Sequence, residues 1–512
     1  MAFIVQQKIK GRIYLYSVES YYDKATKKVK QRRKYLGPKL EDKLTEKTII
    51  PPKFIIKNFG NIYFLNFLIE KSGLKKILQT VFPNDFLDII NLVCYQICQA
   101  EASYLFHYWF EEQFITNCKN LYSDDISDFF VRIGNAKSHR IDFNQQWIEL
   151  QKPVKTIFYD ITSISSYSKN IDLVEWGYNR DKENLPQINL GIIYSQDNHV
   201  PLWYNVFAGS IVDVSTLRNS IIYTNYFKLN DILFVLDCGF FSKSNISEMN
   251  NENNRIKFIM PMSHTTKVSD QIITKFGKKI SSVDSAILFN NQIIHYQKTN
   301  IDYQKNNLDV HIFLNQAIKF ETENHFLSII LEFENKHNNK IFNTLKEFSD
   351  FKKSEIPDKI KSYFKWNKTN LTIEKDMPRI KKELNKSGCF MLTTNDKELD
   401  KLDVLKYYRN KDLVEKVFDS VKNEMDTKRL RTHKQESTEG KLFIKFISAI
   451  LYSLIGKTME EKQLYKTMSI KELIYEMQKI KITVLDDKTK NYSVLTKRQK
   501  KILEAFEIPN VF

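Results

Sequence analysis

Apolar and polar residues alternate near the start of the chain and then change to a helical spacing. Residues 3–37 alternate in FIVQQKI and GRIYLYSVESYY and continue into the basic run KATKKVKQRRKYLG, which predicts a strand pair. Residues 58–120 carry apolar side chains three and four positions apart. This spacing predicts several helices that pack as a bundle.

A different pattern begins at residue 154. The short apolar runs VKTIFYD, QINLGIIYS and VPLWYNVFAG predict three successive strands. DVSTLRNSIIYTNYFKL has helical spacing, DILFVLDCGFFS predicts a buried strand, SKSNISEMNN begins a helix, and IKFIMPM predicts a fifth strand. Three strands followed by helix, strand, helix and strand is the order of a ribonuclease-H-like sheet, although the alternation alone also fits other α/β folds.

Residues 264–386 interrupt this scheme. They mix alternating segments such as AILFNNQIIHYQKT and LDVHIFLN with a Lys- and Asn-rich helical stretch around 333–370. GCFMLTTND then predicts another core strand, and KDLVEKVFDSVKNEMD predicts an amphipathic helix. Because both flanks resemble one sheet, we interpret the segment as a β-rich insertion. The predicted fold class is α/β, with a ribonuclease-H-like core, this insertion and a mainly helical N-terminal region.

The charge balance favours a polyanionic partner. Lys and Arg number 78 against 61 Asp and Glu, which gives a net charge of +17 at pH 7. A positive field of this size attracts DNA or RNA. Lys, Asn, Ile, Phe and Tyr are abundant together, as an A+T-rich genome would encode, so the charge also has a purely compositional explanation.

Cysteine usage and hydropathy indicate a soluble, cytoplasmic protein without a membrane partner. Cys94 and Cys98 lie four apart on a helical pattern, with no second Cys or His pair at zinc-ligand spacing. Buried thiols in a reducing cytoplasm account for them. The longest apolar stretch, residues 442–455, is interrupted by Lys445 and is too short to span a bilayer.

Two carboxylates each follow a predicted buried strand. Asp160 follows IFY, and Asp237 follows LFVL. Open α/β sheets place their active sites at the carboxyl ends of strands, so the two side chains would point into one cleft. Paired carboxylates repel unless cations offset them, and Mg²⁺ prefers such oxygen ligands. Each Asp taken alone is equally typical of a turn or a helix cap.

A third acid comes from the segment YRNKDLVEKVFDSVKNEMDTKRLRTH. Tyr408, Lys411, Glu415 and Lys422 follow one another at intervals of three, four and seven residues, so they can share one helical face. A Glu flanked by Lys could hold metal while the cations neutralise phosphates. A solvated helix with ordinary charge pairs has the same spacing.

This segment resembles the Tyr-x2-Arg-x3-Glu-x6-Lys signature of DDE transposases in the family of bacterial insertion sequence four. The spacing matches throughout, but Lys411 stands where the family has Arg, and Arg409 is two residues out of register. Lys keeps the charge and loses the bidentate phosphate contact. YDITS, LDCGFFS, GCFMLTTND and EGKLFIKFISAIL also resemble family landmarks, so the resemblance covers about residues 154–456.

The resemblance implies a cut-and-paste DNA transposase. Water would nick the end of the element, the freed 3′-hydroxyl would form a hairpin with the opposite strand, and the reopened end would join target DNA. Asp160, Asp237 and Glu415 would be the catalytic residues and would hold two Mg²⁺ ions, for which Mn²⁺ can substitute. One ion would activate a water or 3′-hydroxyl, and the other would stabilise the leaving oxygen.

The resemblance also implies DNA contacts. Tyr408, Lys411 and Lys422 would contact the terminal phosphates and a base displaced at the hairpin, with Arg409 close by. A displaced base needs an aromatic platform. Trp366 in the insertion is a second candidate for that platform, although an aromatic residue in a polar segment also fits a local core.

The expected partners are double-stranded DNA, as element inverted repeats and as target, and a second copy of the chain in a synaptic homodimer. The expected location is the bacterial cytoplasm, in association with the nucleoid. We expect five segments: a strand pair with a helical DNA-binding region (1–150), the first part of the core (151–263), the β-rich insertion (264–386), the second part of the core (387–456) and a helical region for dimerisation (457–512). Two alternatives stay open, a nuclease that cleaves without joining and an inactive DNA-binding protein.

Overall fold

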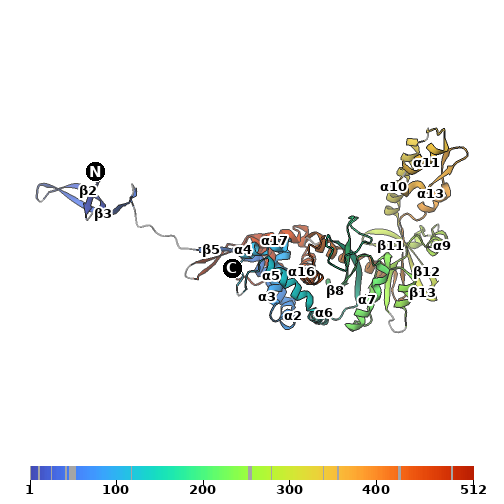
Figure 1. Ribbon diagram of the computed structural model, residues 1–512, viewed down its shortest axis with the longest axis horizontal. Coiled ribbons are helices and arrows are strands. Elements are labelled where there is room, and N and C mark those ends of the chain that lie inside the picture. The colour runs from blue at the N-terminus through green and yellow to red at the C-terminus, as the bar shows by residue number, and fades with distance from the viewer. Residues whose placement is uncertain are drawn as a thin grey trace. The chain divides into compact units, whose positions relative to one another are not determined.

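The computed structural model describes residues 2–9, 12–24, 26–40, 43–44, 54–116, 118–251, 256–277, 280–337, 340–354, 357–424, 428–485 and 488–512. The chain divides into two compact units (Figure 1). The first contains Met1–Lys57 and Ile482–Ser493, and the second contains Asn58–Lys481 and Val494–Phe512.

The first unit consists of two small sheets. One contains β1 (Ala2–Ile9), β2 (Arg12–Asp23), β3 (Lys28–Leu40) and β4 (Lys43–Leu44), and the other contains β5 (Phe54–Asn58), β17 (Lys481–Leu485) and β18 (Lys490–Tyr492). The basic run therefore forms a third strand beyond the predicted strand pair. It is stabilised by opposite charges across the ladder, since Glu19 pairs with Arg32 and Asp23 pairs with Lys28.

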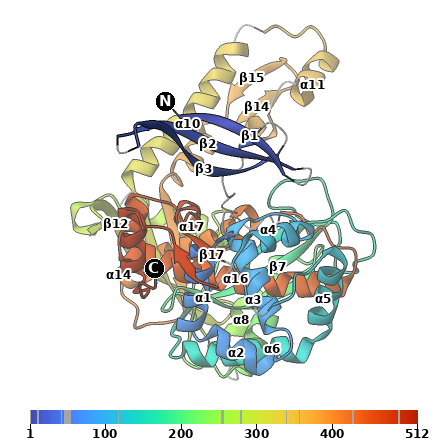
Figure 2. The same ribbon diagram turned by 90° about the vertical axis from the view of Figure 1, so that its left-hand side faces the viewer.

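Helices form the first part of the second unit. They are α1 (Gly60–Lys71), α2 (Leu74–Val81), α3 (Phe86–Cys98), η1 (Ser103–Leu105), α4 (Phe106–Glu112), α5 (Ser123–Asn135) and α6 (Lys137–Gln151). The first five occupy the residues whose spacing predicts helices. α16 (Gln435–Glu461) packs against α3 and α5 (Figure 2).

Among the described residues, α16 alone is long and apolar enough to cross a membrane by length and composition. In its most apolar window, 67% of the residues are buried inside the fold. Lys445, which interrupts the apolar stretch in the sequence, is buried as well, and its ammonium donates a hydrogen bond to Oε1 of Gln96. α16 is therefore the central core helix of the second unit.

A nine-stranded mixed sheet follows the helices. Its strands are β6 (Thr156–Ser165), β7 (Gln187–Ser195), β8 (Val200–Ala208), β9 (Leu233–Val235), β10 (Lys257–Pro261), β11 (Ala286–Phe289), β12 (Gln292–Tyr303), β13 (Asn306–Asn315) and β16 (Cys389–Thr394). The order in space is β11-β12-β13-β16-β10-β9-β6-β7-β8. β9 lies parallel to both β6 and β10, and the other neighbouring pairs are antiparallel.

The connections give the order of elements that the sequence predicts. α7 (Asp213–Tyr226) joins β8 to β9, and η2 (Cys238–Phe240) with α8 (Lys243–Met249) joins β9 to β10. The chain thus runs through three strands, a helix, a strand, a helix and a strand. The structure is a mixed α/β fold with a large mixed sheet.

Side chains of β6 alternate between two apolar clusters. Ile157 and Tyr159 belong to a cluster that includes Phe443 of α16, whereas Phe158 belongs to a cluster that includes Val414. The second face is covered by α14 (Lys401–Arg409) and α15 (Asp412–Asp419). This alternation follows from the two-residue period of a strand. Asp160, two residues after Phe158, therefore lies on the face of the sheet that α14 and α15 cover.

The segment 264–386, where the sequence predicts a β-rich insertion, has two different parts. β11, β12 and β13 continue the main sheet through β16. The other elements are α9 (Lys267–Phe276), η3 (Val283–Ser285), α10 (Gln316–His337), α11 (Leu345–Ser354), α12 (Asp358–Lys361), β14 (Phe364–Asn367), β15 (Thr372–Lys375) and α13 (Met377–Leu384). α10, α11 and α13 gather with the β14–β15 hairpin around a separate core that contains Phe333, Phe351 and Phe364 (Figure 1).

The C-terminal part contains strands as well as helices. Its remaining elements are η5 (Leu464–Lys466), α17 (Ile470–Gln478) and α18 (Lys497–Ala505). β17 and β18 also lie within the region 457–512, for which the sequence predicts a helical region. The β-branched run KITVL forms β17, and its Ile482 is buried.

Candidate active site

Asp160 lies on β6, and Asp237 lies two residues past the end of the neighbouring parallel strand β9. β6 and β9 pair Phe158 with Val235, and the next residues on the same face are Asp160 and Asp237. One detail differs from the sequence-based expectation, because β6 continues past Asp160 to Ser165 in pairing with β7. Asp160 therefore lies where the parallel pairing ends, rather than at the end of its strand.

α15 brings Glu415 to this same face of the sheet. Val414 and Phe418 of α15 share an apolar cluster with Phe158 and Val235. Glu415 follows Val414 directly, and 60% of its side chain is exposed. The apolar contacts thus fix the helix on the sheet, while the carboxylate stays at the solvent edge of the contact.

Lys411 lies between the three carboxylates. Its ammonium nitrogen is 3.3 Å from Oδ1 of Asp237, 3.5 Å from Oε1 of Glu415 and 3.8 Å from Oδ2 of Asp160. Only 8% of the Lys411 side chain is exposed. A single buried cation is therefore shared by acids from β6, from the end of β9 and from α15.

Burial and charge act against each other at this cluster. Burial raises the pKa of Asp160 to about 6, although Lys411 and a 2.8 Å hydrogen bond from the Ile161 backbone N–H both lower it. Burial lowers the pKa of Lys411, but the charges of Asp160, Asp237, Tyr408 and Glu415 together outweigh burial, and the net shift is upward. The Lys411 ammonium is charged at neutral pH, and the cluster still carries an excess of negative charge.

The single helical face predicted for residues 408–422 is only partly present. α14 ends at Arg409, α15 begins at Asp412, and a π-helical turn (Ser420–Glu424) follows. Tyr408 stays near the acids, and its pKa is raised to about 12 by burial and by the nearby charge of Asp237. Lys422 lies instead against Asp181, with 2.6 Å between Nζ and Oδ2. Lys422 lies within the π turn, which does not keep the 3.6-residue period of a regular helix.

Arg409 and Trp366 make local contacts. The guanidinium of exposed Arg409 lies 5.3 Å from the ring centre of Phe390. Trp366 is half-buried in the β14–β15 hairpin, its Nε1 donates to the Lys361 carbonyl at 3.3 Å, and its ring lies 5.5 Å from that of Phe348. The surroundings of Trp366 are those of a small local core.

Residues after β6 contribute charges that the strand pattern does not reveal. Arg180 donates from Nη1 to Oγ of Ser163 at 3.3 Å, and its charge lowers the pKa of Asp160. Glu183 pairs with Arg429 at 3.3 Å, as Asp181 does with Lys422. The acidic and basic residues of YNRDKEN are the only sequence signal for these contacts, and the partners of Asp181 and Glu183 lie 241 and 246 positions away.

The donor set suits a hard divalent cation, since carboxylate oxygens are the ligands that Mg²⁺ and Mn²⁺ prefer. The raised pKa of Asp160 indicates a buried carboxylate that further positive charge would stabilise. Within the described part of the chain, however, no group of three or more His, Cys, Asp or Glu side chains is close enough to hold an ion. The Lys411 ammonium is the cation that these carboxylates share in the present arrangement.

Comparison with known proteins gives one family match. Residues 155–451, more than half of the chain, match the family described as "Transposase DDE domain". A search of curated proteins finds no match.

Two solved structures show low similarity to the chain. The piggyBac transposase synaptic complex with hairpin DNA is 9% identical, with 82% of this chain and 70% of that chain covered and a TM-score of 0.36. The Drosophila P element transposase strand transfer complex is 10% identical, with 67% and 82% covered and a TM-score of 0.15.

Proposed function

The chain belongs to the transposase DDE domain family, and from that premise we propose that Asp160, Asp237 and Glu415 are its three catalytic carboxylates. The observation that carries this proposal is the shared ammonium of Lys411, which lies within 4 Å of all three acids. The acids come from positions 160, 237 and 415, so only the fold brings them together. The activity would be cleavage of DNA at the element's ends and strand transfer into target DNA.

The strand order supports a ribonuclease-H-like core. In β8-β7-β6-β9-β10, β9 lies parallel to β6 and β10, while β7 and β8 complete an antiparallel meander with β6. Asp160 would come from the central strand of this set, and Asp237 would come from its parallel neighbour. In this proposal residues 151–263 and 387–456 are the two parts of the core.

Asp160, Asp237 and Glu415 would hold two Mg²⁺ or Mn²⁺ ions. Bound metal would supply activation of a water or 3′-hydroxyl and stabilisation of the leaving oxygen. Lys411 offsets the repulsion between the carboxylates. If bound metal ions offset this repulsion instead, the Lys411 ammonium would be available to contact a DNA phosphate.

The spacing of Tyr408, Lys411, Glu415 and Lys422 supports membership in the insertion-sequence-four-like superfamily. Tyr408 and Lys411 would contact the terminal phosphate. The charge of Lys422 is neutralised by its ion pair with Asp181. Lys422 would therefore contact the terminal phosphate only after this ion pair breaks. Arg409 is exposed and would contact the DNA backbone outside the acid cluster.

A hairpin route would require an aromatic platform for a displaced base. Trp366 would have to leave its contact with Phe348 to serve. Trp176 and Tyr178, in the loop between β6 and β7, are 63% and 80% exposed. That loop also carries Arg180, whose charge lowers the pKa of Asp160, so the loop lies close to the proposed catalytic residues. Trp176 or Tyr178 would therefore be a better platform for a displaced base than Trp366 in the insertion.

The first unit supports a role in DNA binding. β3 and the turn before it carry Lys24, Lys27, Lys28, Lys30, Arg32, Arg33 and Lys34. Phosphate neutralisation by such a series contributes affinity without sequence preference. Residues 1–150 would bind the element's ends, 264–386 would be the insertion, and 457–512 would support a synaptic homodimer. DNA as substrate would place the protein at the bacterial nucleoid.

An assay with purified full-length protein separates the candidate functions. The substrate is a duplex that carries the inverted repeats flanking the gene, with Mg²⁺ or Mn²⁺ and a supercoiled target plasmid. Cleavage followed by joined products is the expected result. Cleavage without joining would identify a nuclease instead, and binding without cleavage would identify an inactive DNA-binding protein.

A further inference from the structure

A cleft of about 520 Å³ lies in the second unit, between α5 and the start of α16. Residues 102–104 form one wall, residues of α5 from Ser123 to Val131 form a second, and residues 431–434 with the first two turns of α16 form a third. We call it the α5–α16 cleft. The proposed catalytic acids do not line it, so it is separate from the acid cluster.

Basic and hydroxyl side chains line the α5–α16 cleft. Arg431, Lys434 and Lys441 bring three positive charges, and Asp128 is the one carboxylate among the lining residues. Arg431 and Lys434 are exposed, so their charges are open to a ligand. Hydroxyl groups come from all three walls, on Ser103, Tyr104, Ser123, Ser127, Thr432 and Ser437. Arg, Lys, Ser and Tyr are side chains that commonly contact phosphate groups of DNA.

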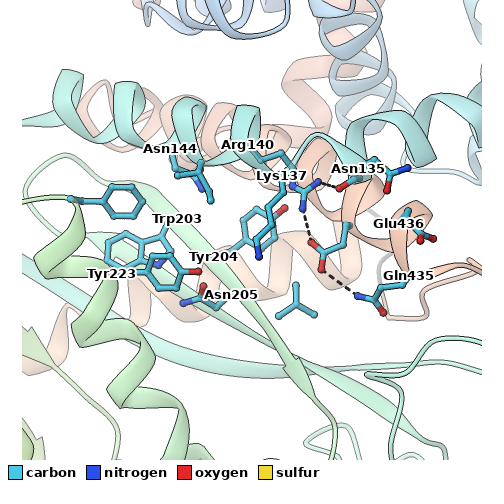
Figure 3. A pocket seen from close by; sticks show the side chains of 15 residues that line it. Asn135, Lys137, Arg140, Asn144, Trp203, Tyr204, Asn205, Tyr223, Gln435 and Glu436 are labelled. Atoms are coloured by element: carbon cyan, nitrogen blue, oxygen red, sulfur yellow. Dashed lines mark hydrogen bonds and ion pairs between the residues drawn. The ribbon is translucent and has the colours of Figure 1, made fainter.

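A second cavity, of about 480 Å³, borders the same two helices but differs in its charges. Figure 3 shows dashed contacts from Arg140 and from Gln435, and both reach Glu439, at 3.2 Å and 3.3 Å. Lys137 and Glu436 add one charge of each sign to this cavity. Because its positive and negative charges balance, it has no net attraction for an anion, whereas the α5–α16 cleft has an excess of positive charge.

The segment before α16 is fixed in a way that turns its basic side chains outward. Leu430 and Thr432 are buried, whereas Arg431 and His433 are exposed. The hydroxyls of Thr432 and Thr438 are hydrogen-bonded at 2.7 Å. Alternate residues thus anchor the segment in the core, and those between them face the cleft. A surface that is ordered before binding loses less conformational freedom when its ligand arrives.

β6 connects the α5–α16 cleft to the acid cluster. The Leu430 N–H donates at 3.0 Å to the carbonyl of Ser165, the last residue of β6. Asp160 lies five residues earlier on this strand, which corresponds to about 16 Å. Leu430 and Val414 belong to one apolar cluster, so the segment leaves the face of the sheet that carries the acids. B-DNA covers about 16 Å in about five base pairs.

We propose that the α5–α16 cleft binds the sugar-phosphate backbone of duplex DNA, at a point about five or more base pairs from the bond that is cleaved. Arg431 and Lys434 neutralise phosphates, and Tyr104, whose side chain is 59% exposed, donates a hydrogen bond to a phosphate oxygen. That the ligand is DNA rests on the proposed function, but the cleft uses none of the proposed catalytic residues.

Fluorescence anisotropy with the full-length protein tests this cleft. The probe is a duplex that carries the inverted repeats flanking the gene, titrated at several salt concentrations. Arg431→Gln and Lys434→Gln should each reduce the slope of log K against log salt by about one, because each removes one phosphate contact. Lys137→Gln is the matched control, since it removes an exposed lysine charge from the cavity of Figure 3. It should leave the slope unchanged.

Duplexes that carry one neutral methylphosphonate locate the contact along the DNA. Where the replaced phosphate is the one that lies in the cleft, the wild type should lose affinity. Arg431→Gln should lose no more, because its contact with that phosphate is already absent. We expect this non-additive position about five or more base pairs from the cleaved bond.

Three results would overturn the cleft as a DNA site although the wild type binds DNA. They are unchanged salt slopes in both variants, an equal loss in Lys137→Gln, and non-additivity only at the cleaved phosphate. Both test variants change exposed side chains, so thermal melting should show both folded, and either one alone carries the test.

Cleavage of the same duplex is measured separately. Arg431-dependent binding without cleavage would contradict the proposed function and leave the cleft in place. A wild type that binds no DNA at any salt concentration would overturn both proposals.

Discussion

The ammonium nitrogen of Lys411 lies 3.3 Å from Oδ1 of Asp237, although 174 positions separate the two residues in the chain. The same nitrogen also contacts Asp160 and Glu415. A lysine therefore occupies the centre of the acid cluster, where the charge of bound metal would otherwise be expected.

Neutralising any one of the three acids should abolish catalysis and spare DNA binding. Asp160→Asn, Asp237→Asn and Glu415→Gln keep the side-chain volume and remove a ligand charge. We expect cleavage of inverted-repeat duplexes to fall by about a thousandfold or more, since metal ligation contributes several kcal/mol to the transition state.

End binding, measured by fluorescence anisotropy, should change less than about threefold in the same variants. Glu398→Gln, which removes an exposed acid outside the cluster, is the control and should cleave normally. Normal cleavage by one of the three test variants would remove that residue from the site.

Lys411→Met should make the folded protein depend more strongly on divalent metal. Without the ammonium, the acids repel one another, and the melting temperature in EDTA should fall by several degrees. Added Mn²⁺ should raise it by more in Lys411→Met than in the wild type, because no ammonium competes. Lys411→Arg should behave as the wild type does. An equal Mn²⁺ shift in all three proteins would contradict a shared position for ammonium and metal.

Asp309 on β13 makes a pH-dependent contribution to stability. Burial alone would raise its pKa, but hydrogen bonds from Lys298, Lys397 and Asn300 outweigh burial and lower the pKa to about 2. The stabilisation is therefore present above the unfolded-state pKa of about 3.9 and is lost as the pH falls toward 2.

Asp309→Asn should accordingly lower the melting temperature by about 3 °C at pH 7. Its difference from the wild type should shrink steadily between pH 4 and pH 2.5. Differential scanning calorimetry across this range checks the trend. A difference that stays constant would show that Asp309 contributes through packing and not through its charge.

Gly440 marks the close approach of α16 to α5. A methyl group there would overlap the backbone carbonyl of Phe130. We expect Gly440→Ala to destabilise the protein by about 2–3 kcal/mol, as measured by denaturant unfolding. Gly456→Ala on the same helix is the matched control, since the nearest atom is the Tyr465 hydroxyl at 3.0 Å. An equal effect at both positions would rule out the close approach as the cause.

The basic strand β3 should dominate the salt dependence of DNA binding. Arg32→Gln combined with Arg33→Gln should reduce the slope of log K against log salt by about two. Lys481→Gln is unsuitable as a control because its ammonium bonds Asn58. Lys501→Gln on the exposed side of α18 is suitable instead. An unchanged slope would place the DNA contacts elsewhere.

The sheet and its two Asp residues follow from local patterns in the sequence. Each Asp ends a short apolar run, and β6 and β9 form from those runs. Glu415 was predicted from the spacing to Lys411, and that contact is present. These features depend on residues within about ten positions of one another, so a local pattern in the sequence is enough to predict them.

Other features depend on partners far along the chain. The sequence pattern does not predict β3, because the strand carries many charged side chains. Those charges become favourable only where they lie opposite Glu19 and Asp23. The break between α14 and α15 and the π turn beyond them redirect Lys422 to Asp181, which lies 241 positions earlier. No periodicity records such a pairing, so the predicted common face of Tyr408, Lys411, Glu415 and Lys422 was too extensive.

A change of metal specificity tests the catalytic site most directly. In Asp237→Cys a thiolate replaces a carboxylate, and thiolates bind Mn²⁺ far better than they bind Mg²⁺. With inverted-repeat duplex as substrate, we predict that the wild type cleaves in both metals and that Asp237→Cys is inactive in Mg²⁺ and regains cleavage in Mn²⁺. If Asp237→Cys is equally active, or equally inactive, in the two metals, Asp237 is not a metal ligand and the proposed site is wrong.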